Sequence, residues 1–214
     1  MIFLGCDGGS TKTEWLLVDH TGQVLAHRIF PGCNFAFWGE DGFRDLMVRS
    51  VQTLLADSGI TSQQITSAML SLTVYGEVPG TEEFFPQVMQ SILPDCPLQF
   101  SNDSVAGWCG SLAGRPGINI VAGTGSVAYG QDSAGNASRV GGWSLFFADE
   151  GSCSWVARQM ITEFVKQADG RHPRSAIYEE LRQELSITHD LYFSGYLQTN
   201  VRQDSSLLAK LQLV

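Results

Sequence analysis

Short apolar runs separated by small polar residues fill the first part of the chain. Residues 2–5, 15–18 and 24–30 are the apolar runs, and they predict three β-strands. Tight turns are expected between them at the Gly-Gly pair of positions 8 and 9 and at Thr21-Gly22. Three antiparallel strands connected in this way form a β-meander.

The pattern then changes to the period of a helix. Residues 31–38 predict a loop that carries three aromatic side chains, Phe35, Phe37 and Trp38. Over residues 42–57 the apolar side chains recur at helical spacing, and Gly59 is a suitable end for that helix.

Strands and helices alternate in the next segment. Strands are predicted at residues 68–72 and 98–100, and helices at 81–93 and from residue 104 onward. Asp103 or Ser104 is expected to cap the last of these helices. This order of elements predicts an α/β protein with a mixed sheet.

The opening arrangement then returns in outline. Residues 118–122, 127–130 and 138–140 predict three more strands, with a turn of glycines and hydroxyls at 123–126 between the first two. A second meander with a second glycine turn indicates an internal duplication of the architecture, with two facing phosphate-binding turns.

Helical patterns make up the rest of the chain. The helix after residue 152 is expected to bury Trp155, Val156, Met160, Ile161, Phe164 and Val165. Three apolar stripes follow, formed by Ile177, Leu181 and Leu185, by Leu191, Tyr192, Tyr196 and Leu197, and by Leu207, Leu208, Leu211 and Val214. The last stripe either packs on an earlier helix or indicates that a covering segment is missing.

Composition narrows the class of protein. The 214 residues are 43% hydrophobic and 16% charged, which is typical of a globular protein of one large or two small domains. A net charge of −9 argues against a protein that coats nucleic acid or an anionic membrane. The sequence shows neither a signal peptide nor a membrane-spanning run, and its five scattered cysteines suit a reducing, cytoplasmic setting.

The first glycine turn has the composition of a phosphate site. Glycines let the backbone approach a ligand, and successive N–H groups can bind an anion. The expected nucleotide-binding residues here are Gly8, Gly9, Ser10, Thr11 and Lys12, with Thr13 as a further hydroxyl. Asp7 precedes them and is the expected ligand of Mg²⁺. An ordinary hairpin tip is the alternative interpretation.

Asp103 is the candidate general base. It follows a strand and opens a helix, where α/β proteins gather ligand-handling groups, and it could accept the proton of an attacking hydroxyl. The alternative is a helix N-cap.

Further candidates lie on both sides of Asp103. Gly123, Thr124 and Gly125 would bind phosphates from the other side. Asp149 and Glu150 could bind sugar hydroxyls or stabilise a helix N-terminus. Asn34 and Trp143 suit a carbohydrate pocket, although Trp143 could equally fill a core.

Four segments, taken in chain order, resemble motifs of the N-acetylglucosamine kinases. They are residues 7–13, 102–103, 123–126 and 141–152. These kinases are BadF/BadG/BcrA/BcrD-type ATPases of the actin, heat-shock chaperone and sugar-kinase superfamily. The resemblance extends from Met1 to about Phe164 and is less distinct beyond it.

The resemblance implies an α/β protein of duplicated ribonuclease-H-like (actin-like ATPase) domains, with mixed sheets flanked by helices. The domains would span residues 1–102 and 103–214, the second incomplete, with ATP in the cleft between them. The implied activity is Mg²⁺-dependent transfer of the ATP γ-phosphate to the 6-hydroxyl of N-acetylglucosamine or a related amino sugar. By position, Thr11 and Thr124 would contact ATP, Asp103 would be the base, and the sugar would contact Asn34, Asp103, Gly142, Trp143 and Asp149.

The chain departs from the family pattern in two ways. Ser144 and Ala148 stand where the family usually has glycine, which restricts the loop and bears on sugar preference. Family members also continue beyond a point like Val214, so a shortened kinase is expected, with a homodimer left open.

Two rival functions remain. An ATPase that activates a 2-hydroxyacyl-CoA dehydratase or benzoyl-CoA reductase would need an iron–sulfur cluster, and the five cysteines form no convincing ligand set. A non-catalytic sugar sensor would keep the sugar loops without a complete nucleotide pocket.

Overall fold

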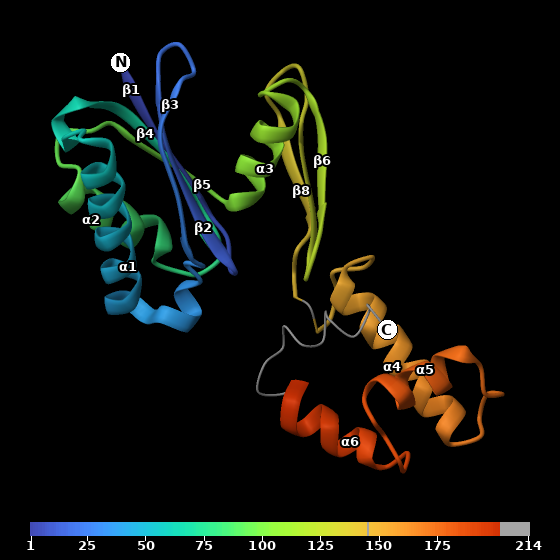
Figure 1. The fold of residues 1–214 in the computed structure, drawn as a ribbon. Coiled ribbons are helices and arrows are strands. Elements are labelled where there is room, and N and C mark those ends of the chain that lie inside the picture. Colours follow the sequence, from blue (N-terminus) through green and yellow to red (C-terminus); the bar gives the residue numbers. More distant parts are fainter. Residues whose placement is uncertain (145, 202–214) are drawn as a thin grey trace. The chain divides into compact units, whose positions relative to one another are not determined.

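The computed structural model describes residues 1–144 and 146–201 of the 214-residue chain. Two compact units make up the chain, Met1–Gly114 and Arg115–Val214, and each is described by itself (Figure 1). The apolar stripe expected from Leu207 to Val214 lies outside the described residues.

The N-terminal unit is built on a five-stranded mixed sheet. Its strand order is β3-β2-β1-β4-β5, with β1, β2 and β3 antiparallel and with β1, β4 and β5 parallel. The strands are β1 (Ile2–Gly8), β2 (Lys12–Asp19), β3 (Val24–Pro31), β4 (Ile65–Leu72) and β5 (Leu98–Ser101). The α/β class, the mixed sheet, the first meander and the two strands that follow it are confirmed.

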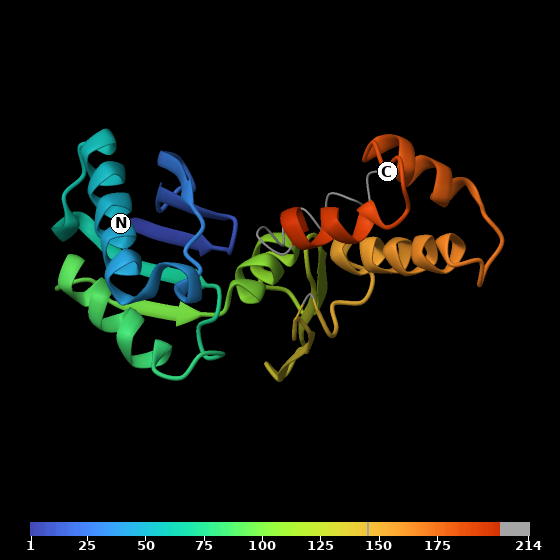
Figure 2. The same ribbon diagram turned by 90° about the horizontal axis from the view of Figure 1, so that it is seen from below.

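Helices α1 (Phe35–Ser58) and α2 (Thr81–Ile92) cover one face of this sheet (Figures 1 and 2). The period of two in the strands explains why: alternate residues such as Leu4, Cys6 and Leu17 point to this side and are buried. Phe43 of α1 stacks on Phe85 of α2, with ring centroids 4.2 Å apart. The other set of alternate residues, which includes Asp7, points to the opposite face.

Helix α3 (Asp103–Leu112) lies against that opposite face and contacts β1 and β4. Its N-cap is Asn102, whose side-chain oxygen accepts a hydrogen bond from the Ser104 amide at 3.2 Å. The expectation that Asp103 or Ser104 caps this helix is therefore wrong. Asn102 takes that role because its extended backbone turns its side chain toward the first free amide.

The loop expected at residues 31–38 is shorter than predicted. Asn34 caps α1 by accepting a hydrogen bond from the Ala36 amide at 3.0 Å, so Phe35 to Trp38 already form a helical turn. Gly39, at φ 63°, breaks the helical path after that turn, a conformation that glycine adopts without strain. The predicted end at Gly59 is confirmed by its φ of 66°.

The C-terminal unit contains a three-stranded antiparallel sheet of order β6-β7-β8 and a group of helices. The strands are β6 (Gly117–Ala122), β7 (Ser126–Gln131) and β8 (Ala137–Gly141). The helices are α4 (Cys153–Ala168), α5 (Ala176–Glu184) and α6 (Tyr192–Tyr196), with π-helical hydrogen bonding at Leu197–Val201. The second meander is confirmed.

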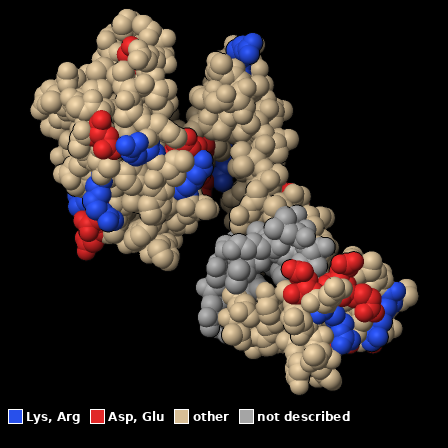
Figure 3. Space-filling model, in the orientation of Figure 1, with Lys and Arg blue, Asp and Glu red and all other residues tan. Residues whose placement is uncertain are grey.

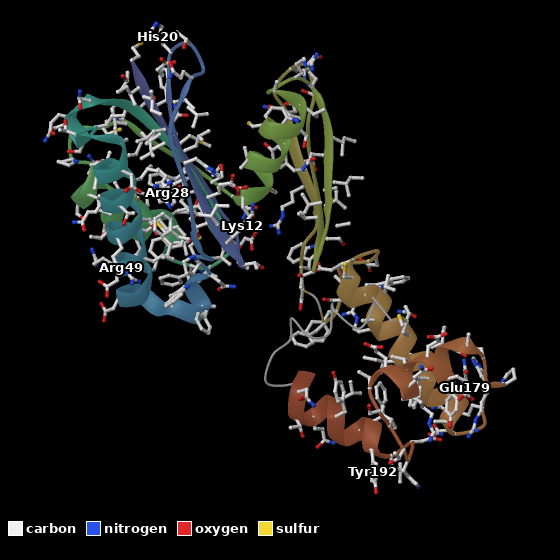
Figure 4. The ribbon with its side chains drawn as sticks, in the orientation of Figure 1. Lys12, His20, Arg28, Arg49, Glu179 and Tyr192 are labelled. Carbon is white, nitrogen blue, oxygen red and sulfur yellow. The ribbon has the colours of Figure 1, made fainter. Side chains whose placement is uncertain are left out.

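The core of these helices differs in part from the expected stripes. Phe164, Tyr178 and Phe193 form its aromatic centre, with Phe164 stacked on Tyr178 at 5.3 Å. Leu191 and Tyr192 are exposed instead, and Tyr192 points away from α4 and α5 (Figure 4). The short α6 presents Phe193 to the core because a helix of this length can bury only one narrow face.

Six residues of α4 were predicted to be buried, and the prediction is wrong at two of them. Val156 and Val165 are more than a third exposed, whereas Phe164 is buried. The buried residues of α4 are Ser154, Ala157, Phe164 and Gln167, and Met160 and Ile161 pack against the core.

The surface has no single dominant charge on the face seen in Figure 3. Basic side chains occur there in small groups beside acidic ones, and most of that face is uncharged (Figure 3). Among the described residues, every helix is too short or too polar to cross a bilayer. The domain boundary expected at residues 102 and 103 stays a prediction, although contacts group α3 with the N-terminal unit.

Candidate active site

The carboxyl ends of β1, β4 and β5 gather the predicted residues of the N-terminal unit. Parallel strands bring these ends to one edge of the sheet, where α/β proteins bind ligands. Asp7 and Gly8 end β1, Thr73 follows β4, and Asp103 follows β5. Asp7 points to the face that α3 covers and Asp103 opens α3, so both residues lie at this edge of the sheet.

The glycine turn at residues 8–12 is the tip of the β1–β2 hairpin. The Gly9 amide donates to the Lys12 carbonyl at 2.9 Å, and Cys33 donates its own amide to the Gly9 carbonyl at 3.0 Å. Ser10 and Thr11 stay exposed at the tip. The turn is thus closed by its own backbone and leaves hydroxyls available to a ligand.

Close packing explains two glycines at this tip. A Cβ on Gly8 would lie 2.6 Å from Leu72 and 2.7 Å from the Cys33 sulfur. A Cβ on Gly32 would lie only 2.0 Å from the Ser10 carbonyl oxygen. The prediction from sequence missed Gly32, because nothing local to Pro31-Gly32 indicates that the chain passes this close to the turn.

Asn34 lies beside the same turn. Its side-chain nitrogen is 3.4 Å from the Ser10 hydroxyl, which is in turn 3.4 Å from the Thr73 hydroxyl. These polar contacts connect the start of α1, the glycine turn and the end of β4. Of these residues, Thr73 was not among the predicted site residues, and its position directly after a predicted strand was the available signal.

Asp7 is opposed across the hairpin by Glu14, its direct partner on β2. Loss of hydration is the main cause that raises the pKa of Asp7, and the Glu14 charge adds to it, while Lys12 acts in the opposite direction. Excess negative charge at this point suits a bound cation, and a carboxylate oxygen is a ligand that Mg²⁺ prefers. Asp7 therefore fits the predicted Mg²⁺ site.

Lys12 projects from the start of β2 (Figure 4) and donates to Glu14 Oε2 at 2.7 Å. His27 lies 2.9 Å from the other oxygen of Glu14. The bond from Lys12 is the first cause that lowers the pKa of Glu14, and His27 is the second. Lys12 thus lies on the Asp7 side of the hairpin, held by Glu14.

A cavity of about 490 Å³ lies on this side of the sheet. Asp7, Glu14 and Ser71 form its polar part, while Leu16, Met69 and Ala106 of α3 contribute apolar surface. Asp103 is close enough to the turn for its charge to act on Cys33, whose thiol pKa is raised to about 11, chiefly by burial.

The second set of predicted residues belongs to the C-terminal unit. The turn at residues 123–125 is closed by a hydrogen bond from the Gly123 amide to the Gly125 carbonyl at 2.9 Å. The Gly123 carbonyl accepts from the Cys153 amide at 2.9 Å, which ties the turn to the start of α4. Ser152, not Asp149 or Glu150, caps α4 by accepting from the Trp155 amide.

Asp149 is the most unusual side chain of this set. It is only 6% exposed, and its Oδ1 has no hydrogen-bond partner among the residues that the structure describes. Its Oδ2 lies 2.6 Å from the position that a Cβ on Gly125 would take. A buried carboxylate with an unused oxygen, beside a glycine turn, has the character of a ligand-binding group.

Gly142 and Trp143 follow β8 on the way to Asp149. Gly142 has a φ of 69°, and its carbonyl accepts from Arg139 at 2.9 Å. Trp143 is 85% exposed, so the alternative that it fills a core is wrong.

The family can now be stated from comparison with known proteins. Residues 4–210 match the model of the BadF/BadG/BcrA/BcrD ATPase family. The chain belongs to this family. It is 26% identical over 200 residues to an N-acetyl-D-glucosamine kinase of Dictyostelium discoideum, covering 88% of this chain and 62% of that protein. An N-acetylmuramic acid/N-acetylglucosamine kinase of Clostridium acetobutylicum is 23% identical, over 92% of this chain and 66% of its own length.

Solved structures agree on the fold. A protein of Chromobacterium violaceum, assigned as an N-acetylglucosamine kinase, superposes with a TM-score of 0.71 at 20% identity, over 98% of this chain and 72% of that one. A ROK hexokinase of Thermus thermophilus gives a TM-score of 0.54 at 15% identity, over 77% of this chain and 64% of that one. The chain therefore has the α/β fold of actin-like ATPases, and it spans less than two thirds of the length of these curated relatives.

Proposed function

We propose that the chain carries the phosphate and sugar sites of an ATP-dependent kinase that phosphorylates the 6-hydroxyl of N-acetylglucosamine or a related amino sugar. The observation that carries this proposal is the common position of Asp7, the glycine turn and Asp103 at one edge of the N-terminal sheet. The family and its kinase members support it.

In this mechanism Asp103 accepts the proton of the sugar hydroxyl as its oxygen attacks the γ-phosphorus of ATP. The bond from that phosphorus to the bridging oxygen breaks, and ADP leaves. Asp103 suits this role because it opens α3 directly after β5, at the edge of the sheet that carries the glycine turn, and Asn102 rather than Asp103 is the N-cap of that helix.

The remaining residues bind and orient. Ser10, Thr11 and the amides of the hairpin tip would bind phosphate oxygens, and so would the turn at Gly123–Gly125. Asp7 would hold Mg²⁺, which offsets phosphate charge when bound. Asn34, Gly142, Trp143 and Asp149 would contact the sugar.

The decisive variant is Asp103→Asn. It keeps the shape of the side chain but cannot accept the proton, so turnover should fall by about 10²–10⁴ while ATP affinity is retained. Asp95→Asn, which removes an exposed acid before β5, is the matched control and should keep wild-type turnover. Wild-type turnover in Asp103→Asn would exclude Asp103 as the base.

The sugar is identified by testing the candidate sugars one at a time. Relatives are named for N-acetylglucosamine, N-acetylmuramic acid and glucosamine, so each should be offered with ATP and Mg²⁺, and calorimetry should measure each sugar and ATP separately. Sugar binding without any ATP binding would favour the sensor function instead. Oligomeric state and cellular compartment stay predictions.

A further inference from the structure

The connection between β4 and α2 begins in a strained conformation. Val74 has a φ of 61°, in the left-handed region that β-branched residues rarely adopt. A residue strained in this way persists only where its surroundings hold it. The contacts of residues 73–77 show what holds it.

The first anchor is Thr73, at the phosphate turn. Its amide donates to the Gly8 carbonyl at 2.7 Å, and its hydroxyl lies 3.4 Å from that of Ser10. Thr73 is 8% exposed, so these contacts are largely shielded from water. Tyr75 adds an apolar contact by stacking on Phe100, with centroids 5.7 Å apart.

The second anchor is Glu77, at the start of α3. Glu77 Oε1 accepts a hydrogen bond from Asn102 Nδ2 at 2.8 Å. Asn102 Oδ1 meanwhile accepts from the amide of Ser104 at 3.2 Å and from its hydroxyl at 2.8 Å. Both ends of the Asn102 amide are thus used, and only one orientation of the side chain satisfies all three bonds.

We propose that Glu77 is a positioning residue for Asp103 that acts through Asn102, and that residues 73–77 tie the general base to the phosphate turn. The role of Asp103 as base rests on the proposed function. Without the Glu77 acceptor, Asn102 loses the contact that orients its amide, and the first turn of α3 loosens. Asp103 is the first residue of α3, so its carboxylate moves relative to the hairpin tip at Gly8–Ser10.

The test compares Glu77→Ala with Glu77→Gln. Glu77 is exposed, so both variants should fold. Glu77→Gln removes the charge but keeps the acceptor oxygen, and its kcat should stay close to wild type. Glu77→Ala removes the acceptor, and its kcat should fall about 10–100-fold with KM for ATP unchanged, as expected when a reacting group is misplaced. Glu83→Ala, an equal change of charge at an exposed position of α2, should behave as wild type.

A second measurement needs no turnover. Amide hydrogen exchange at residues 104–106 should accelerate in Glu77→Ala and remain slow in Glu77→Gln and Glu83→Ala. Unchanged exchange in Glu77→Ala, or an equal loss of kcat in both Glu77 variants, would overturn the positioning role. If the wild-type chain phosphorylates none of the sugars, the proposed function fails, while the exchange experiment still decides whether Glu77 orders the start of α3.

Discussion

At the scale of single residues, two carboxylates are held at a cost to the fold. Asp149 has a φ of 60°, is buried and leaves Oδ1 without a partner among the described residues. Asp7 faces Glu14 across the hairpin and loses part of its hydration. Groups kept in unfavourable surroundings are typical of binding sites, because a ligand relieves the cost.

Asp149→Asn should weaken the binding of sugar. Asparagine tolerates a positive φ as aspartate does, so the substitution keeps the fold and removes only the charged acceptor. A hydrogen bond to a charged group contributes about 1.5–3 kcal/mol, so sugar affinity measured by calorimetry should fall at least about tenfold. Unchanged affinity would remove Asp149 from the sugar site.

Asp7→Asn should raise the midpoint of thermal unfolding at pH 7, without Mg²⁺ or nucleotide. The pKa of Asp7 is raised in the fold, so its ionised form is disfavoured there relative to the unfolded chain. This destabilisation is complete above the folded-state pKa and disappears as the pH falls below the unfolded value.

Asp19→Asn is the control of opposite sign. The Thr21 hydroxyl is the main cause that lowers the pKa of Asp19, and backbone amides add to it. Its carboxylate therefore stabilises the fold above the unfolded pKa, and the substitution should lower the midpoint at pH 7. A lower midpoint for Asp7→Asn as well would contradict the assigned sign.

At the scale of elements, each meander has a glycine turn after its first strand. The surroundings of these two turns are packed differently. The turn at Gly8 and Gly9 is enclosed by the ends of β4 and β3, as the short Cβ distances at Gly8 show. The turn at residues 123–125 meets a side chain at one glycine only: a Cβ on Gly123 would meet nothing within 4 Å, whereas one on Gly125 would lie 2.6 Å from Asp149. Space for a side chain is therefore available at Gly123 but not at Gly125 of the same turn.

Gly125→Ala should weaken sugar binding because the added methyl displaces the Asp149 carboxylate. Overpacking of this kind typically costs about 1–3 kcal/mol. Gly123→Ala adds the same methyl into open space and should keep wild-type sugar affinity in the same calorimetric titration. Equal effects of both substitutions would show that the turn, rather than its contact with Asp149, is responsible.

At the scale of the whole molecule, the two units differ in how completely they bury their apolar residues. The N-terminal unit encloses a core formed by strands β1, β2 and β4 with helices α1 and α2. In the C-terminal unit the core lies among the helices, and Ile118, Ile120 and Val140 of the sheet are about 70% exposed. Exposed apolar side chains of this size on the two outer strands of one small sheet are characteristic of a surface that binds other groups.

Residues 1–114 expressed alone should therefore fold. Urea unfolding followed by circular dichroism should show one cooperative transition, because the core of this unit needs no residue from the other. Residues 115–214 should bind more of the dye ANS than residues 1–114 do. A gradual, non-cooperative transition for residues 1–114 would show that the unit depends on the rest of the chain.

Sequence patterns predicted most elements because their causes are local. The period of two in residues 2–8, the glycine stop at Gly59 and the small-residue turns depend on neighbours a few positions away. The same reasoning selected Asp7, the glycine turns and Asp103 as candidate site residues, and their roles stay predictions. It misplaced the start of α1 and the cap of α3, since Asn34 and Asn102 cap through geometry that composition alone does not distinguish from other polar residues.

The sequence by itself determined the α/β class, the two meanders and the chemical types available at the candidate site. Only the tertiary structure decided which of these groups meet. The hydrogen bond from Asn102 to Glu77 joins residues 25 positions apart, and the contact of Ser10 with Thr73 joins residues 63 apart. Such pairings depend on the parallel register of β1, β4 and β5, which brings distant residues to one edge of the sheet and leaves no periodic trace in the chain.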